Sequence, residues 1–372
     1  MRDLLVTSHT PVLRSGRALR TYGIARALAS NGGLDLLYAR FEDPVPDAAF
    51  SSITGVELHV AIPSRGPQRL LAFAAARRTG VPSGIARGVS PELVGEAERL
   101  AGAPGRGRVI ADGPVAAAAL SRLAQRRPVI YNAHNFESGF RHELDRSGHR
   151  ERDALRTFER RLLERASESW MVSEPDLAAA RELSPEARLR YVPNVVDVQA
   201  IAPVPQAPDQ RAIFVANFAY TPNRDGLRFL LEEVFPRVWV ELPEARLALV
   251  GAGLDEPPSH DRRVESVGFV ADLREAYARA RCAVVPLQLG GGTPLKLIEA
   301  LAYGLPVIAT RRATAGLGLR DGEHCLIADD DETFARELIE VLRDGAPELG
   351  RRGRELAAER YSIETLSRLL RD

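Results

Sequence analysis

Residues 289–299 read Leu289-Gly290-Gly291-Gly292-Thr293-Pro294-Leu295-Lys296-Leu297-Ile298-Glu299. Three glycines precede threonine and proline, and apolar residues at helical spacing follow. Because threonine is a good N-cap and proline is favoured at the first helical position, we expect a helix over 294–303 with Thr293 as its cap. The apolar run 283–286 before the loop is typical of a buried strand. The stretch therefore predicts a strand, a glycine loop and a helix in succession.

Lys296 is the only lysine in the sequence, and the other 49 of the 50 basic residues are arginines. The positive end of the helix dipole disfavours a cation in a first turn, unless an anion binds there with the amides of the glycine loop. Glu299 follows on the same helical face, where its carboxylate is able to accept two hydrogen bonds from a vicinal diol such as a ribose. We interpret the pair as a candidate anion and diol site. The alternative, that skewed codon usage left one lysine by accident, stays open.

Apolar strand-like runs alternate with helical segments along the whole chain. The predicted strands are 4–8, 34–39, 56–62, 109–112, 129–133, 170–173, 189–192, 212–218, 246–250, 264–269, 283–286, 307–310 and 325–328. The predicted helices are 17–30, 91–101, 115–126, 150–166, 174–183, 223–240, 271–279, 294–303, 331–343 and a C-terminal stretch. This alternation predicts an α/β protein with parallel sheets covered on both faces. Three prolines within 200–209 predict a linker between two Rossmann-like domains that face one another across a cleft.

Composition excludes several classes of protein. The 372 residues suffice for two ordinary domains, and 50 acidic residues balance 50 basic ones, so no basic field indicates a nucleic-acid partner. Two cysteines form no disulfide framework. A first strand that begins almost at the initiator methionine leaves no room for a signal peptide, and no stretch approaches the roughly 20 apolar residues of a membrane span. We expect a cytoplasmic protein without a transmembrane segment; peripheral membrane contact and the oligomeric state stay open.

Several stretches together carry a resemblance to a known family. They are Val285-Pro286-Leu287, Gly290 to Thr293, Lys296 to Ala300 and Gly304-Leu305-Pro306-Val307-Ile308-Ala309-Thr310, supported by Tyr191-Val192-Pro193-Asn194-Val195-Val196-Asp197, Phe214-Val215-Ala216-Asn217 with Pro222-Asn223, Val267-Gly268-Phe269-Val270 and Ala133-His134-Asn135-Phe136-Glu137-Ser138. In this order they resemble glycosyltransferase family 4, also called glycosyl transferases group 1, over nearly the whole chain. The resemblance implies the GT-B fold, with an acceptor domain over 1–199, the linker 200–209, a nucleotide-sugar domain over 210–355 and a C-terminal helix within 356–372 that packs back on the first domain.

The resemblance also implies sugar transfer from a nucleotide-diphosphate sugar, with retention at the anomeric carbon and without a metal or other cofactor. By position, Lys296 and His134 resemble catalytic residues. The implied donor and nucleotide contacts are Glu299, Gly290, Gly291, Gly292, Thr293, Pro294, Leu295, Asn217, Arg224, Gly268, Phe269 and Val270. Ser15 and Gly16 resemble a loop before the first helix that faces the acceptor or the diphosphate. The acceptor itself, whether a small molecule, natural product, glycan or lipid-linked sugar, is not indicated.

Two departures from the family pattern limit these implications. The glutamate that the family often has eight positions before Glu299 is replaced by Gly291, so the identity of the sugar does not follow. An arginine and lysine pair is also absent: Asn217 stands for the arginine and Pro222-Asn223 for the region of the lysine. Neutralising a phosphate would then depend on Lys296, with or without Arg224. These losses favour a competing hypothesis, a non-catalytic GT-B module that binds nucleotides or partners; a sugar-nucleotide epimerase is a third.

Overall fold

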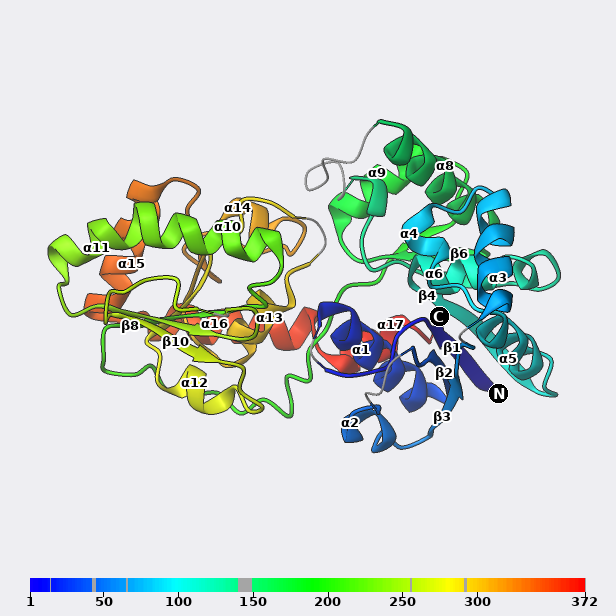
Figure 1. The fold of residues 1–372 in the computed structure, drawn as a ribbon. Coiled ribbons are helices and arrows are strands. Elements are labelled where there is room, and N and C mark those ends of the chain that lie inside the picture. Colours follow the sequence, from blue (N-terminus) through cyan, green and yellow to red (C-terminus); the bar gives the residue numbers. More distant parts are fainter. Residues whose placement is uncertain are drawn as a thin grey trace. The chain divides into compact units, whose positions relative to one another are not determined.

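The computed structural model describes residues 1–13, 15–41, 45–64, 66–139, 149–254, 256–290 and 293–371. The chain divides into two compact units, shown as a ribbon in Figure 1. The first unit comprises residues 1–194 and 363–372, and the second comprises residues 195–362. Each unit has one parallel sheet of its own. No helix in the described ranges has the length and apolar character needed to cross a membrane.

The first unit contains, in its described part, a seven-stranded sheet. Its strands in spatial order are β3 (Val56–Ala61), β2 (Gly33–Ala39), β1 (Arg2–Thr7), β4 (Arg106–Asp112), β5 (Ile130–Asn132), β6 (Glu168–Met171) and β7 (Leu189–Tyr191). Its helices are α1 (Gly16–Asn31), α2 (Ala48–Ser51), α3 (Pro67–Arg78), α4 (Ser83–Ala86), α5 (Pro91–Ala101), α6 (Gly113–Ala119), α8 (His149–Arg165), α9 (Glu174–Leu183) and α17 (Ile363–Leu369). In the central strand β1, Leu4, Leu5 and Val6 are all fully buried, as expected of a strand covered on both faces.

The second unit contains six strands among its described residues. In spatial order they are β10 (Val264–Gly268), β9 (Arg246–Val250), β8 (Arg211–Val215), β11 (Cys282–Val285), β12 (Val307–Ala309) and β13 (Leu326–Ile327). The helices are α10 (Thr221–Phe229), α11 (Phe235–Glu241), α12 (Arg274–Ala278), α13 (Leu295–Ala302), α14 (Arg311–Thr314), α15 (Asp331–Asp344) and α16 (Pro347–Arg360), with a π-helical turn at Leu230–Val234.

Adjacent residues of β8 serve two different cores. Phe214 lies in the core that includes residues of α10, α11 and α15, whereas Ile213 lies in the core that includes residues of α12, α13 and α16. Since successive side chains of a strand point to opposite faces, these two sets of helices cover the two faces of the sheet. Figure 1 shows α10 and α11 on one side of the strands and α12 on the other.

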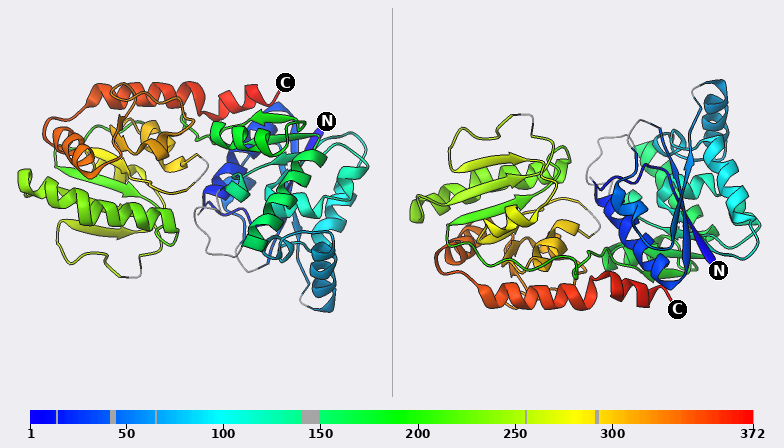
Figure 2. Two further views of the ribbon diagram at one scale, coloured as in Figure 1. Left: turned by 90° about the horizontal axis from the view of Figure 1, so that it is seen from above. Right: turned by 90° about the horizontal axis from the view of Figure 1, so that it is seen from below.

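The predicted fold class, an α/β protein with two Rossmann-like units, is confirmed, and every predicted strand overlaps an observed one. The last helix packs within the first unit: the Ser367 hydroxyl lies 2.6 Å from that of Ser30, and the Asn31 side chain donates to the Ser367 carbonyl at 2.8 Å. Figure 2 shows α17, in red, beside α1, in blue. The predicted cleft between the two domains stays a prediction.

The boundaries between the units differ from those that we expected. Residues 200–209 belong to the second unit and do not form a linker, because Val204 and Ala207 are buried and their amides donate to the carbonyls of Tyr303 and Ala280. The chain passes between the units after residue 194 and again after residue 362. The expected C-terminal helix within 356–372 is two helices, of which α16 belongs to the second unit.

Two further differences concern helices. The predicted helix 223–240 is interrupted by the π-helical turn directly before α11, where Pro236 removes one backbone donor and its ring crowds the preceding turn. Helix α3 was not predicted, because none of its residues is buried and it therefore lacks an apolar stripe.

Candidate functional site

Helix α13 begins at the end of the glycine loop that follows β11. Its N-cap is Pro294, with ψ of 103°, so the helix begins at Leu295 and not at Pro294, and Thr293 does not cap it. Thr293 is buried instead. Gly291 and Gly292 lie outside the described residues. The predicted strand and helix are thus present, with the helix beginning one residue later because the extended Pro294 cannot belong to it.

Lys296 lies in the first turn of α13 and is partly buried. Its Nζ donates a hydrogen bond to the side-chain oxygen of Asn223 and lies 5.4 Å from the centre of the Phe214 ring. Burial lowers the pKa of Lys296 to about 7. In the part of the chain that the structure describes, no carboxylate forms a salt bridge with this ammonium. The contacts of this ammonium group are an amide oxygen and a ring face, so a bound anion would stabilise its positive charge.

Asn223 positions the lysine. It is buried on α10, and its side-chain nitrogen donates to the Asn217 carbonyl at 2.7 Å, which directs its oxygen toward Lys296. The predicted nucleotide contact Asn217 accepts a hydrogen bond from the Ala219 amide at 3.0 Å, so its side chain stabilises its own loop. Sequence reasoning did not predict an individual role for Asn223. The signal was present only as its place in the Pro222-Asn223 motif.

Glu299 lies one turn after Lys296 and is also partly buried. Burial raises the pKa of Glu299 to about 7. No donor among the described residues binds its carboxylate. Burial together with the charge of Glu299 raises the pKa of Tyr303, whose ring stacks on that of Tyr277 at 4.4 Å, to about 12. An acid and a base on one helical turn, both with pKa values near 7, are typical of functional sites.

The glycine loop approaches α10 at Gly290. Its φ of +113° is strained for any other residue, and a Cβ there would lie 3.5 Å from the Pro222 ring. The Gly290 carbonyl accepts a hydrogen bond from Arg312 at 2.7 Å, which brings an arginine that was not predicted next to the loop. Arg224 is exposed in the first turn of α10, one residue after Asn223.

The structure does not bring every predicted contact to the same strand ends. Gly268 is the last residue of the edge strand β10, and Phe269 and Val270 follow it; β9 and β8 separate that strand from β11. Gly268 has φ of +76° and Phe269 is 58% exposed. Leu295, the first residue of α13, is buried.

In the first unit, His134 and the loop before α1 lie at the carboxyl ends of the strands. The Ser15 hydroxyl caps α1 by accepting a hydrogen bond from the Ala18 amide at 3.3 Å. A Cβ on Gly16 would meet no atom within 4 Å, so the backbone at that turn faces open space. His134 is buried, and its Nε2 lies 2.9 Å from a carboxylate oxygen of Asp112, at the end of β4.

Asp112 organises this histidine and was not predicted. The same carboxylate accepts from Asn132 at 2.7 Å and from Thr21 at 2.6 Å. Burial acts to raise the pKa of Asp112, but the charge and hydrogen bond of His134 outweigh it and hold that pKa well below its usual range. An ionised Asp112 fixes the proton of His134 on Nε2 and orients the ring. Sequence reasoning missed Asp112 because nothing local distinguishes an acid that ends a strand.

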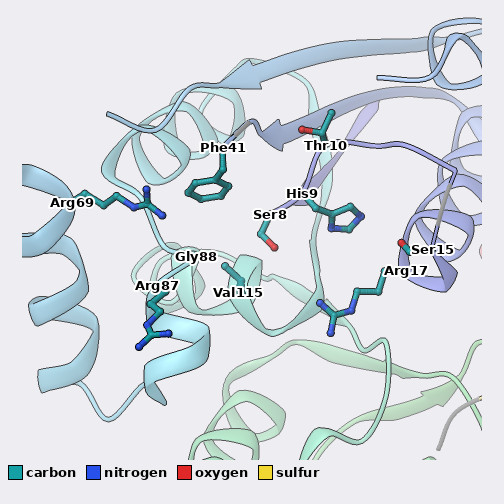
Figure 3. A pocket seen from close by; sticks show the side chains of 10 residues that line it. All are labelled: Ser8, His9, Thr10, Ser15, Arg17, Phe41, Arg69, Arg87, Gly88 and Val115. Carbon is teal, nitrogen blue, oxygen red and sulfur yellow. The ribbon is translucent and has the colours of Figure 1, made fainter. Parts of the chain in front are cut away.

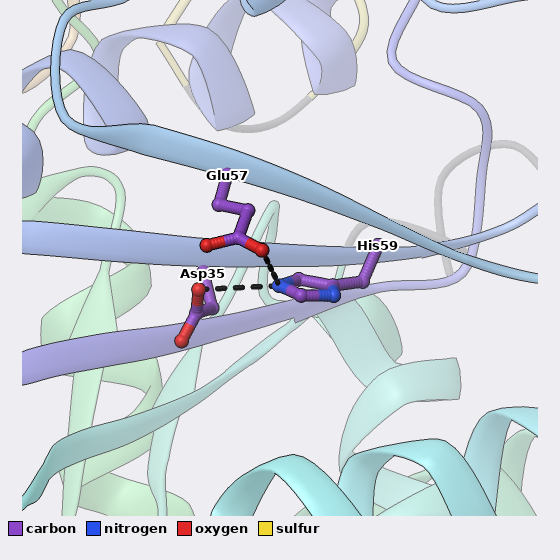
Figure 4. A group of neighbouring side chains, drawn as sticks. All are labelled: Asp35, Glu57 and His59. Atoms are coloured by element: carbon purple, nitrogen blue, oxygen red, sulfur yellow. Dashed lines mark hydrogen bonds and ion pairs between the residues drawn. The ribbon is translucent and has the colours of Figure 1, made fainter.

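Two further features of the first unit bear on ligands. A cavity of about 640 Å³ opens beside β1 and α1, and its lining includes Ser8, His9, Ser15 and Arg17 (Figure 3). The second feature is the cluster of Asp35, Glu57 and His59 (Figure 4), in which His59 Nε2 lies 3.1 Å from Asp35 and 3.8 Å from Glu57.

The Asp35 cluster has the side chains of a metal site but the charge balance of an ion-pair network. Asp35 forms salt bridges with Arg106 and, at 3.3 Å, with Arg2, so two guanidinium groups already neutralise it. Asp35 and Glu57 also lie near the amino ends of β2 and β3, whereas ligands of parallel sheets bind at the carboxyl ends. We interpret the cluster as structural.

A comparison with protein families points to the same family as the sequence motifs around the glycine loop. The model of the family Glycosyl transferases group 1 matches residues 209–344, which include the glycine loop and α13. The lipopolysaccharide core biosynthesis glycosyltransferase LpsE of Rhizobium meliloti is 29% identical over 159 residues, which are 39% of this chain and 44% of that relative. The chain thus matches less than half the length of this curated relative. The suspected resemblance to this family is confirmed over the matched residues.

Solved structures show the same fold. Sucrose-phosphate synthase from Thermosynechococcus elongatus has a TM-score of 0.75 at 18% identity, covering 100% of this chain and 97% of that chain. Anabaena HepE, solved in complex with UDP and glucose, has a TM-score of 0.70 at 15% identity, covering 99% of this chain and 98% of that chain. At such identities the likeness concerns the fold alone, and the fold class is the GT-B type that the resemblance implied.

Proposed function

We propose that this chain is a retaining glycosyltransferase that moves a sugar from a nucleotide-diphosphate sugar to an acceptor without a metal ion. The observation that carries the proposal is the pair on α13. Lys296 and Glu299 lie one turn apart after a glycine loop, without a salt bridge between them, in the segment that matches the family. Lys296 would bind the diphosphate and Glu299 the ribose hydroxyls, while the amides of the glycine loop take phosphate oxygens.

The chemistry follows from where charge develops. As the bond between the anomeric carbon and the diphosphate oxygen breaks, negative charge grows on the leaving group, and the carbon becomes oxocarbenium-like. A preorganised cation and amides stabilise that charge without reorganisation. The acceptor hydroxyl forms the new bond on the same face, and its proton passes to the leaving phosphate oxygen. His134, oriented by Asp112, is proposed to lie beside the donor sugar.

The nucleotide, the cellular location and the metal requirement belong to the same proposal. HepE was solved with UDP, so UDP-sugars are the first donors to test. We propose a cytoplasmic enzyme, where nucleotide sugars are the co-substrates. The consecutive acids Asp330 and Asp331 already have partners within the protein, which supports metal-free transfer. Asp330 caps α15 by accepting from the Thr333 amide at 2.7 Å, and Asp331 pairs with Arg237.

One observation favours the second candidate, a non-catalytic nucleotide-binding module. At the place of the family's arginine and lysine pair, the exposed Asn217 and the buried Asn223 bring no charge, and Gly291 brings no carboxylate. A module of this kind would bind nucleotides through Lys296 and Glu299 but would not cleave the sugar bond.

Release of nucleoside diphosphate separates the two candidates. The purified chain is incubated with UDP-, GDP-, ADP- and dTDP-sugars, with and without acceptors, and the free diphosphate is measured. The glycosyltransferase proposal predicts release from one donor class, accelerated by an acceptor. Saturable binding of a nucleotide sugar without any release would establish the non-catalytic module instead, and conversion of one nucleotide sugar to another would indicate the epimerase.

A further inference from the structure

The cavity in the first unit is lined by groups from separate elements that meet at the carboxyl ends of the parallel strands. Ser8, His9 and Thr10 follow β1, Phe41 follows β2, and Val115 lies on α6 after β4. Its volume of about 640 Å³ is in the range of small-molecule sites. All lining residues belong to the first unit, which is the unit that the proposed function assigns to the acceptor.

The cavity is positively charged. Arg17 comes from α1, Arg69 from α3 and Arg87 from the residue after α4, and no acidic residue lines the cavity in the described ranges. Figure 3 shows the guanidinium groups of Arg69 and Arg87 on one side of the cavity and that of Arg17 on the other. His9 adds no charge at neutral pH, because burial lowers its pKa to about 4.

These three arginines differ from others in the chain. Arg106, Arg108 and Arg211 pair with carboxylates. Within the described residues, none of Arg17, Arg69 and Arg87 forms a salt bridge with a carboxylate. Arg69 instead lies with its guanidinium 5.0 Å from the centre of the Phe41 ring.

Arg20 shows what a structural arginine looks like in the same helix. It is buried one turn after Arg17, and its guanidinium donates to the side chains of Asn132 and Asn194 and to the carbonyl of Val192. The two arginines near the start of α1 therefore differ: Arg20 holds the unit together, and Arg17 lines the cavity. Arg14 lies outside the described residues.

The remaining lining groups fit a sugar. The hydroxyls of Ser8, Thr10 and Ser15 are able to exchange hydrogen bonds with sugar hydroxyls, and Phe41 offers an apolar face. Guanidinium groups bind phosphates and carboxylates through paired, charge-assisted hydrogen bonds. We propose that this cavity binds an acceptor sugar that carries a phosphate or a carboxylate, with the anion against Arg69 and Arg87 and the sugar hydroxyls toward Ser8, Thr10 and Ser15. The proposal rests on the proposed function, whose acceptor class it names.

Binding of charged and neutral sugars to the purified full chain tests this. Glucose, galactose and mannose are compared with their 6-phosphates, with glucuronate and galacturonate, and with inorganic phosphate by calorimetry. At least one charged sugar should bind about 10-fold to 100-fold more tightly than its neutral counterpart, the range for charge-assisted hydrogen bonds. Binding of a 6-phosphate alone identifies a phosphate acceptor, and binding of a uronate alone identifies a carboxylate acceptor.

The matched variants are Arg69→Gln with Arg87→Gln, and Arg78→Gln as the control. Arg78 is an exposed arginine on α3 that does not line the cavity, so the control removes one positive charge from the helix of Arg69 without changing the lining. The double variant should bind charged sugars no better than neutral ones, and the control should bind them like the wild type. Equal binding of charged and neutral sugars by the wild type, an unaffected double variant, or inorganic phosphate bound as tightly as any sugar phosphate would overturn the proposal.

The experiments distinguish a failure of this inference from a failure of the proposed function. A chain that releases nucleoside diphosphate from a donor but shows no preference for charged sugars retains the proposed function and loses this inference. A chain that binds a sugar phosphate through Arg69 and Arg87 but turns over no nucleotide sugar loses the proposed function and retains the anion site.

Discussion

Binding of a nucleoside diphosphate should load a proton onto Lys296. In the empty site, burial lowers the pKa of this lysine from 10.5 to about 7. The lysine is then only about one-tenth charged at pH 8, because pH 8 lies about one unit above that pKa. A diphosphate that accepts a hydrogen bond from Nζ favours the charged form and raises the pKa. Affinity for UDP should therefore be greatest below pH 7 and should fall as the pH rises through the pKa of the empty site.

The magnitudes support an uptake of nearly one proton. The difference between a pKa of 10.5 and one of about 7 corresponds to roughly 5 kcal/mol against the charged lysine. A single negative charge about 4 Å away returns roughly 4 kcal/mol at an effective dielectric constant of about 20. The pKa in the complex is then close to that of an ordinary lysine, so the side chain changes from mostly neutral to mostly charged when UDP binds at pH 8.

Calorimetry measures this proton directly. UDP is titrated at pH 8 in two buffers of different ionisation enthalpy, with the wild type and with Lys296→Met, which keeps the length of the side chain and removes its charge. The wild type should take up close to one proton more than the variant at pH 8, and the difference should nearly vanish at pH 6, where Lys296 is already charged. Equal proton uptake by the two proteins at pH 8 would refute the reasoning.

Three further predictions concern the ribose, the metal and the fold. Glu299→Ala should weaken UDP binding by roughly 1.5–3 kcal/mol, the range for hydrogen bonds to a charged group, and unchanged affinity in calorimetry would remove the ribose role. Transfer should survive EDTA; complete loss that Mn²⁺ or Mg²⁺ restores would contradict metal-free transfer. Arg20→Leu should lower the free energy of unfolding by roughly 1.5–3 kcal/mol in urea titrations, because buried acceptors lose their charged donor, whereas the exposed control Arg17→Leu should change it little. Equal stability of these two variants would show that the buried contacts of Arg20 contribute nothing.

The strands were accessible to sequence reasoning because each is a continuous apolar run, as in β1, where Leu4, Leu5 and Val6 are all buried. Helix α3 was not, since a helix that buries none of its residues carries no periodic pattern. The prolines of 200–209 indicated a linker, but the buried Val204 and its bond to Tyr303 depend on the folded second unit.

The residues of the site also divide into those that local sequence predicts and those that it does not. Lys296 and Glu299 were identified from a short local motif, since a glycine loop and a helix start are contiguous in sequence. Asn223, Asp112 and Arg69 were not, because each acquires its role from a residue or cavity formed by distant segments: Asn223 from Lys296, Asp112 from His134, and Arg69 from the cavity. Parallel strands bring such residues together at one edge, and no local pattern records it.

The most direct test of the central claim, that Lys296 stabilises the leaving diphosphate, is the turnover rate of Lys296→Arg on the donor that the wild type uses. The substitution keeps a charge, but the wide guanidinium must replace one ammonium between Asn223 and the Phe214 ring. We predict that kcat falls on the order of 10²–10³-fold, the scale of removing one electrostatic stabiliser, with a smaller change in donor KM and a near-normal Tm. Wild-type turnover by Lys296→Arg would contradict the claim and leave the lone lysine without a catalytic role.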